Sequence, residues 1–96
     1  MDAGSLDEIR AGMDAVDREI VSLIARRVAY VRAAAKFKTS SANVAAPDRV
    51  ALVLKSRREC AETAGLDGEV VERLYRELVA YCVSEEHKEW EALNKP

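Results

Sequence analysis

The chain has 96 residues, about half of them hydrophobic, and a formal net charge of −2 from 15 basic and 17 acidic residues. Because the two signs are interspersed, the sequence shows no basic footprint for nucleic acid or for an anionic membrane, and any anion site must be a local cluster of positive charge. The length predicts a single domain over residues 1–96, with no apolar run near the ~20 residues of a membrane span. The first residues lack a secretory-signal pattern, so we expect a cytoplasmic protein.

The first predicted element is a long helix over residues 5–38. It begins with a capping box formed by Ser5 and Glu8. Apolar residues then recur at the three-four spacing of a helix packed along a seam, at Leu6, Ile9, Met13, Val16, Ile20 and Leu23. A second apolar row consists of Val21, Ile24, Val28, Val31 and Ala35. A helix of this length would extend about 50 Å, too long for a compact monomer of this size, so both observations predict a partner helix from a second copy of the chain.

The remaining chain predicts a loop and two further helices. Residues 39–46 break the periodicity and are predicted to be a mobile loop. A short helix begins at Pro47 or Asp48 and ends at Gly65, and Asp67 caps the third, medium helix. The stripe of the short helix consists of Val50, Val53, Leu54, Arg57 and Ala61. That of the third helix consists of Val70, Val71, Leu74, Leu78, Val79, Cys82 and Trp90. We therefore predict an all-α protein of three helices (long, short, medium).

Four basic residues near these stripes are candidate anion ligands. Arg27 takes the next position in the three-four spacing of the long helix, where a guanidinium is costly to bury without an anion; either an internal carboxylate or a bound ligand would supply one. Lys38 follows about three turns later on the same face, and Arg49 lies at the positive end of the second helix. Arg10 is about 25 Å from Arg27 along the axis, so it could serve the same ligand only from an antiparallel partner subunit. We interpret the other basic residues as surface charges: Arg18, Arg26, Arg32, Lys36, Arg57, Arg58 and Arg73.

Glu86 is the acidic counterpart of this cluster. It lies in the apolar stripe of the third helix, where a carboxyl either keeps its proton and donates a hydrogen bond or pairs with a basic residue of the first helix. His87 has no second histidine or cysteine nearby, so no metal site or nucleophilic relay is expected, and we interpret Cys60 and Cys82 as small core residues. The remaining set, several cations and one carboxyl, suits the orientation of a small dianion.

These residues give the chain a family resemblance from Leu6 to Trp90. The matching pieces are Leu6-Asp7-Glu8-Ile9-Arg10, Asp14-x-x-Asp17, Arg26-Arg27, Ala35-Lys36-Phe37-Lys38, Ala46-Pro47-Asp48-Arg49-Val50 and Gly65-Leu66-Asp67. In their combined spacing the chain resembles the all-helical chorismate mutases, and within them the branch that includes isochorismate-pyruvate lyases. The resemblance implies an intertwined homodimer with two equivalent sites and no cofactor.

The resemblance also implies roles for single residues. Arg27 and Arg10 of the partner subunit would bind the two carboxylates of the substrate. Lys38 would contact a carboxylate and the breaking ether oxygen, Arg49 would lie at the same pocket and Val83 would line it. Glu86 stands where many members have Gln, which donates to the ether oxygen. Lys38, Glu86 and Arg27 are therefore the expected catalytic residues.

Two departures bear on the reaction. A carboxyl at Glu86 can donate only when protonated, so a mutase would lose activity as the pH rises and Glu86 loses its proton. Val50 stands where many mutases have an acidic residue that holds the ring hydroxyl of chorismate, and this favours the lyase branch. We expect rearrangement of chorismate to prephenate first, and conversion of isochorismate to salicylate and pyruvate as the alternative. A non-catalytic helical dimer module is a third possibility, in which Arg27→Ala would leave partner binding and stability nearly unchanged.

Overall fold

The structure is a computed structural model that describes residues 4–96. The chain forms a long helix α1 (Leu6–Ala34), a 3-10 turn η1 (Ala35–Phe37), a one-turn helix α2 (Ser41–Ala45), and two longer helices, α3 (Pro47–Thr63) and α4 (Gly68–Leu93). No strand occurs in this described part of the chain. The predicted all-α class and the order of long, short and medium helices are confirmed.

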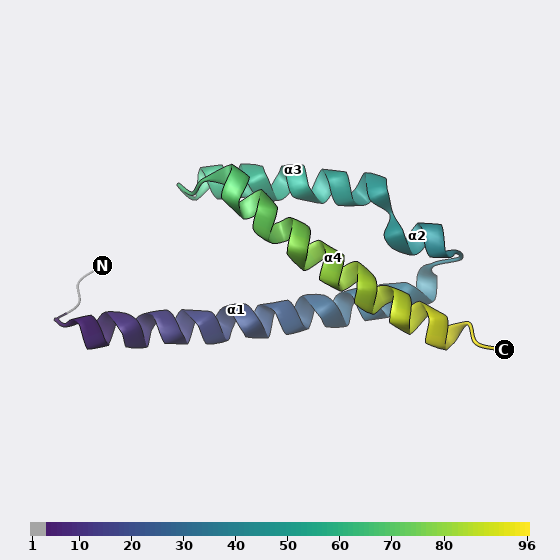
Figure 1. Ribbon diagram of the computed structural model, residues 1–96, viewed down its shortest axis with the longest axis horizontal. Helices are drawn as coiled ribbons and strands as arrows, with labels where there is room; N and C mark the ends of the chain where they lie inside the picture. The colour runs from purple at the N-terminus through teal and green to yellow at the C-terminus, as the bar shows by residue number, and fades with distance from the viewer. Residues whose placement is uncertain (1–3) are drawn as a thin grey trace.

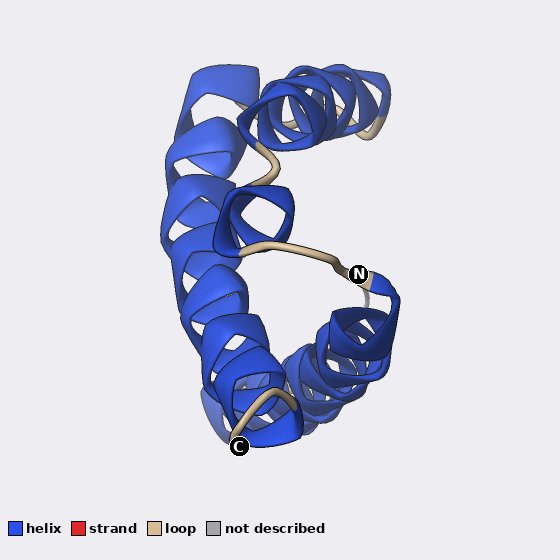
Figure 2. Ribbon diagram, turned by 90° about the vertical axis from the view of Figure 1, so that its right-hand side faces the viewer, coloured by secondary structure: helices blue, strands red, loops and turns tan. Residues whose placement is uncertain are grey.

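Helix α4 holds the other elements together (Figure 1). It packs against α3 along one part of its length and against α1 along another, and it also contacts α2 and η1. Figure 2 shows α1 and α3 on the same side of α4, with α2 between them. Helix α4 therefore lies beside both α1 and α3, and α2 lies near one end of the pair.

The predicted helix ends are largely present. The Ser5 hydroxyl accepts from the Glu8 amide at 3.2 Å, and the Glu8 carboxylate accepts from the Gly4 amide at 2.7 Å. Gly65 is left-handed with a φ of 80°, and the Asp67 side chain accepts from two first-turn amides of α4. Pro47 rather than Asp48 defines the start of α3: proline excludes a helical conformation for the preceding residue, and Ala46 has a φ of 39°.

The long helix is shorter than predicted. It leaves α-helical geometry at Ala34, passes through η1, and ends before Lys38, whose backbone is extended with φ −92° and ψ 137°. The carbonyl of Lys38 accepts a hydrogen bond from the indole N–H of Trp90, 52 residues later, at 3.1 Å. Because this hydrogen-bond donor lies 52 residues away, nothing in the sequence around Lys38 indicates that its carbonyl leaves the helix, and the helix end was not predicted.

Residues 39–46 were wrongly predicted to be entirely a loop. The Ser40 hydroxyl accepts from the Asn43 amide at 3.2 Å and caps α2, and Val44 within it is buried. A helix of five residues is too short to leave a periodic pattern in the sequence. The prediction that both cysteines lie in the core is also half wrong, because Cys82 is buried but Cys60 is exposed.

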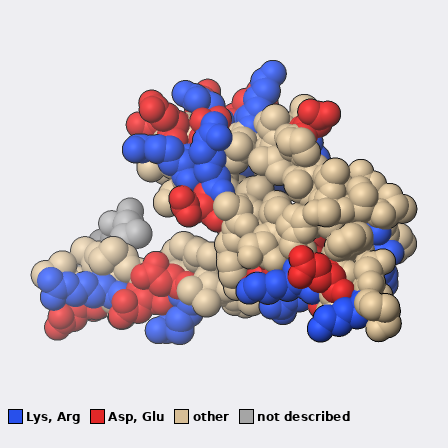
Figure 3. All heavy atoms as spheres, turned by 45° about the vertical axis from the view of Figure 1, so that its right-hand side comes forward, with Lys and Arg blue, Asp and Glu red and all other residues tan. Residues whose placement is uncertain are grey.

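The molecule is elongated. Its radius of gyration is 17.0 Å and its extents are 60 × 25 × 15 Å, whereas a compact chain of this length has a radius near 12–13 Å. The first half of α1 projects beyond the other helices (Figure 1). Its seam is uncovered: Leu6, Ile9, Met13, Val16, Ile20 and Leu23 are between 37% and 57% exposed. Acidic and basic side chains lie interspersed along the projecting arm on the face shown in Figure 3.

Candidate active site

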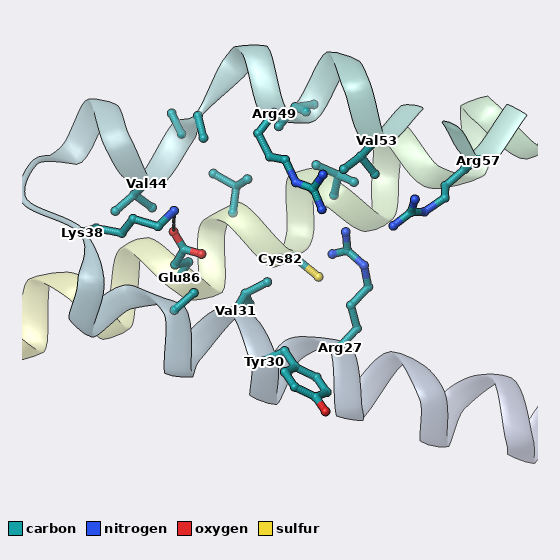
Figure 4. A pocket seen from close by; sticks show the side chains of 16 residues that line it. Arg27, Tyr30, Val31, Lys38, Val44, Arg49, Val53, Arg57, Cys82 and Glu86 are labelled. Carbon is teal, nitrogen blue, oxygen red and sulfur yellow. Dashed lines mark ion pairs between the residues drawn. The ribbon is translucent and has the colours of Figure 1, made fainter. Parts of the chain in front are cut away.

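A cavity of about 420 Å³ lies between α1, α2, α3 and α4 (Figure 4). Its apolar wall comes from valines on all four helices, namely Val31, Val44, Val50, Val53, Val79 and Val83. Its polar groups are four basic side chains (Arg27, Lys38, Arg49 and Arg57) and one carboxyl (Glu86). An apolar pocket with a few convergent charges is typical of a site for a small charged ligand.

Three arginines converge on one part of the cavity. Arg27 enters from α1, and Arg49 and Arg57 enter from α3 on the opposite side (Figure 4). In the described chain, none of the three has a carboxylate within ion-pair distance. This arrangement argues against the structural explanation of Arg27, in which an internal carboxylate would satisfy it.

Lys38 and Glu86 meet at the opposite end of the cavity. The Lys38 ammonium lies 3.3 Å from the Glu86 carboxylate and donates to the carbonyl of Asn43 at 3.2 Å (Figure 4). Glu86 is only 6% exposed, and its Oε2 is the one buried side-chain oxygen or nitrogen in residues 4–96 that makes no hydrogen bond. The contact is therefore an ion pair without hydrogen-bond geometry, and it leaves Oε2 with acceptor capacity that no other group of residues 4–96 fills.

Two residues of α4, one turn apart, hold Lys38. Glu86 faces its ammonium, and Trp90 donates from its indole to its backbone carbonyl. Glu86 and Trp90 are four residues apart and lie on one face of α4, so this face contacts both the side-chain ammonium and the backbone carbonyl of Lys38. The predicted ion pair between Glu86 and a basic residue is thus formed, and its partner lies just beyond the first helix rather than within it.

A second ion pair joins α1 to α4 outside the cavity. Arg32 donates to Glu85 at 2.9 Å, and Lys88 lies 3.4 Å from the same carboxyl group. The hydrogen bond from Arg32 holds the pKa of Glu85 below its usual range, and Glu85 in turn raises the pKa of Arg32. This pair lies next to Glu86 in sequence but does not line the cavity, and it tethers the end of α1 to α4.

The structure brings together five of the six predicted site residues. Arg27, Lys38, Arg49, Val83 and Glu86 line the cavity. Arg10 is exposed on the projecting part of α1 and does not line it. At 1.5 Å per residue it lies about 25 Å from Arg27 along the same helix. Because of this separation, Arg10 and Arg27 of one chain cannot bind the same small ligand, and Arg10 could reach it only from a partner subunit.

Sequence reasoning missed Arg57. It was interpreted as a surface charge, but it is half-buried and its guanidinium points into the cavity (Figure 4). The signal was present, because Arg57 lies in the apolar stripe of α3 just as Arg27 lies on the seam of α1. The criterion of a charged residue within an apolar stripe identifies both Arg27 and Arg57.

Other kinds of site find no support in the described residues. Residues 4–96 hold no group of three or more histidine, cysteine, aspartate or glutamate side chains placed to bind a metal ion. No helix among them is long and apolar enough to cross a membrane.

Comparison with known proteins agrees with this geometry. Residues 9–87 match the family model described as chorismate mutase type II. The chain is 40% identical over 89 residues to a protein of Pseudomonas aeruginosa named isochorismate pyruvate lyase, which covers 93% of this chain and 88% of that protein. It is 29% identical over 85 residues to the T-protein of Haemophilus influenzae, covering 88% of this chain but only 22% of that longer protein. On the family match and the near-complete overlap with the first of these relatives, this chain belongs to the chorismate mutase type II family of enzymes.

Proposed function

We propose that the enzyme acts on a cyclic dicarboxylate that carries an enolpyruvyl ether, and that its main reaction converts isochorismate to salicylate and pyruvate. The observation that carries the proposal is the division of the cavity into two ends. Three unpaired guanidiniums at one end suit carboxylates, and a lysine beside a buried carboxyl at the other suits an ether oxygen that gains negative charge as its bond to the ring breaks.

The chemistry requires no covalent intermediate with the protein. The ring–oxygen bond breaks, and the ether oxygen becomes the keto oxygen of pyruvate. One hydrogen leaves the ring, which becomes aromatic, and joins the enolpyruvyl methylene carbon, which becomes the methyl group. Both changes occur within one substrate, so the protein's role is to hold the side chain over the ring and to stabilise charge at the oxygen.

Two observations favour the lyase reaction over the mutase reaction that the sequence put first. Val50 lines the cavity directly after Arg49 and cannot accept a hydrogen bond from a ring hydroxyl, the role of an acidic side chain in many mutases. The relative named isochorismate pyruvate lyase overlaps this chain over nearly the full length of both.

Rearrangement of chorismate to prephenate is the second candidate. It breaks the same ether bond and forms a carbon–carbon bond instead of transferring a hydrogen, and it needs the same cations. The family match supports it. In either reaction Lys38, Glu86 and Arg27 are the catalytic residues that we propose, with Arg49 and Val83 shaping the pocket.

The proposed site is completed by a second copy of the chain. The uncovered seam of α1 fits another copy of itself in antiparallel orientation, and this would bring Arg10 of the partner subunit to the level of Arg27. In this homodimer two equivalent sites are each built from both chains.

The test presents each substrate to the purified protein. Isochorismate should yield fluorescent salicylate and one equivalent of pyruvate, and chorismate should yield prephenate at a lower kcat/KM. Arg27→Ala should lower both activities by about two orders of magnitude or more, as expected when a charged contact to the reacting molecule is lost. Failure to form any of the three products across the pH range would refute the proposal and favour the non-catalytic module.

A further inference from the structure

Helix α3 directs an ordered row of side chains at the cavity. Arg49, Val53 and Arg57 are spaced by four residues, so they lie on one face of the helix. Val53 is buried against the other helices and fixes the orientation of that face. The two flanking arginines therefore reach into the cavity together (Figure 4).

The neighbouring Arg58 shows what a structural arginine on this helix looks like. It lies 3.5 Å from Glu62 on its own helix and 3.5 Å from Glu72 on α4, so its charge is neutralised within the fold. Arg57 is also half-buried, but it donates a hydrogen bond to the Ser56 hydroxyl at 3.1 Å rather than to a carboxylate. No carboxylate of residues 4–96 lies within ion-pair distance of it.

The charge balance of the cavity is uneven. Four basic side chains face one carboxyl, and that carboxyl already contacts Lys38. The remaining positive charges are those of Arg27, Arg49 and Arg57, which point toward one another across the cavity (Figure 4); Arg27 and Arg57 are half-buried and Arg49 is exposed. Repulsion between these like charges destabilises the protein without a ligand. An anion bound between them would be attracted to all three and would turn this repulsion into a favourable interaction.

We propose that Arg57 is a substrate-binding residue, which together with Arg27 holds one carboxylate at the end of the cavity away from Lys38. The inference rests on the proposed function for the identity of that carboxylate. Two guanidiniums from opposite helices offer a carboxylate several charge-assisted hydrogen bonds in a planar arrangement, which a lysine cannot reproduce.

This pairing has a consequence for ligand choice. A molecule with a single carboxylate leaves part of the positive charge of Arg27, Arg49 and Arg57 unpaired, whereas a dicarboxylate can neutralise more of it. A site built around charged partners discriminates strongly against ligands that lack them. Arg57 should therefore contribute to the selection of dicarboxylates over monocarboxylates.

The experiment compares Arg57→Gln with Arg58→Gln, a matched variant that removes the same charge from the next position of the same helix. The probes are benzene-1,3-dicarboxylate and benzoate, with dissociation constants from titration calorimetry and KM and kcat from turnover of isochorismate and chorismate. We expect Arg57→Gln to weaken dicarboxylate binding about tenfold or more, Arg57→Lys to weaken it less, and Arg58→Gln to change it by less than about twofold.

Thermal unfolding without ligand separates a binding role from a structural one. Arg57→Gln should raise Tm, because it removes a like-charge contact, whereas Arg58→Gln should lower Tm, because it breaks two ion pairs. Unchanged dicarboxylate affinity in Arg57→Gln, or a lowered Tm with unchanged affinity, would overturn the inference in favour of a structural ion pair across subunits.

The outcomes also separate this inference from the proposed function. Binding that depends on Arg57 in a protein that turns over neither substrate would refute the function and leave the anion site standing. Turnover with normal KM and kcat in Arg57→Gln would refute the inference alone. A wild-type protein that binds neither the dicarboxylate nor either substrate would contradict both.

Discussion

At the scale of single residues, Glu86 is the one carboxyl of the cavity in residues 4–96, and we propose that it acts on the substrate. The carboxyl is buried beside Lys38, with one oxygen that makes no hydrogen bond. A carboxyl can donate a hydrogen bond to an ether oxygen only while it holds its proton, whereas the amide of a glutamine donates in every buffer.

Replacement of Glu86 by Gln tests this dependence. Glutamine donates at every pH, whereas a carboxyl donates only while protonated, so the ratio of kcat/KM of Glu86→Gln to that of the wild type should rise with pH, measured between about pH 5 and 8. Steady-state kinetics across that range measure the difference, and Glu91→Gln, on the exposed end of the same helix, serves as the control. Parallel pH profiles for wild type and Glu86→Gln would show that Glu86 does not act as the donor.

The residue scale also shows what sequence reasoning can find. Charges in apolar stripes led to Arg27 and Glu86, helical spacing placed Lys38 on the same face as Arg27, and the positive end of the second helix led to Arg49. Arg57 satisfied the same criterion and was set aside, because one charge in an otherwise mixed helix resembles a solvated surface residue. Arg57 lies in the apolar stripe and Arg58 does not, and the structure adds that Arg57 faces α1 across the cavity while Arg58 pairs with Glu62 and Glu72.

At the scale of elements, α4 holds Lys38 at the cavity. The indole of Trp90 holds the Lys38 carbonyl, and Asn43 of α2 accepts from its ammonium. These contacts fix the point at which residues 39–46 leave η1. The sequence predicted the three long elements from their periodicity and caps, but it could not predict η1 or α2, since both depend on contacts with α4 and span too few residues to show a period.

Removal of the indole donor should loosen this segment. Trp90→Phe deletes one hydrogen bond to the Lys38 carbonyl, so we expect kcat to fall by up to about tenfold with a smaller change in KM. Hydrogen exchange of the amides in residues 39–46 should become faster. Tyr81→Phe, which removes an exposed hydroxyl from the same helix, should change neither quantity; unaltered exchange in Trp90→Phe would refute the positioning role.

The Arg32–Glu85 pair gives a pH-dependent tether between α1 and α4. Because Arg32 lowers the pKa of Glu85 in the folded protein, the pair stabilises the fold above the ordinary glutamate pKa of 4.5, and this contribution is lost as the pH falls through the lowered value. Glu85→Gln should therefore lower Tm at pH 7 by a few degrees at most, since Arg32 is half exposed. The difference in Tm from wild type should shrink progressively as the pH falls below 4.5; a difference that stays constant from pH 7 into that acidic range would contradict the assignment.

At the scale of the whole molecule, the elongated shape and the uncovered seam have the same cause, which is the projection of the first half of α1 beyond the other helices. The sequence predicted a helix too long for a compact monomer, and in the structure the first half of α1 contacts no other helix along that seam (Figure 1). The same half carries Arg10, far from the cavity of its own chain. A dimer would bury the seam and add the fourth arginine to each site.

Mixing two inactive variants tests the shared site most directly. In a mixed dimer of Arg10→Ala and Arg27→Ala subunits, one pocket contains both substitutions and the other contains neither. Each variant alone should be nearly inactive towards isochorismate and chorismate. After the two are unfolded and refolded together in equal amounts, about half of the dimers are mixed, so activity should return to about one quarter of the wild-type value. Activity that stays at the level of the separate variants would contradict an active site assembled from two chains around Arg27.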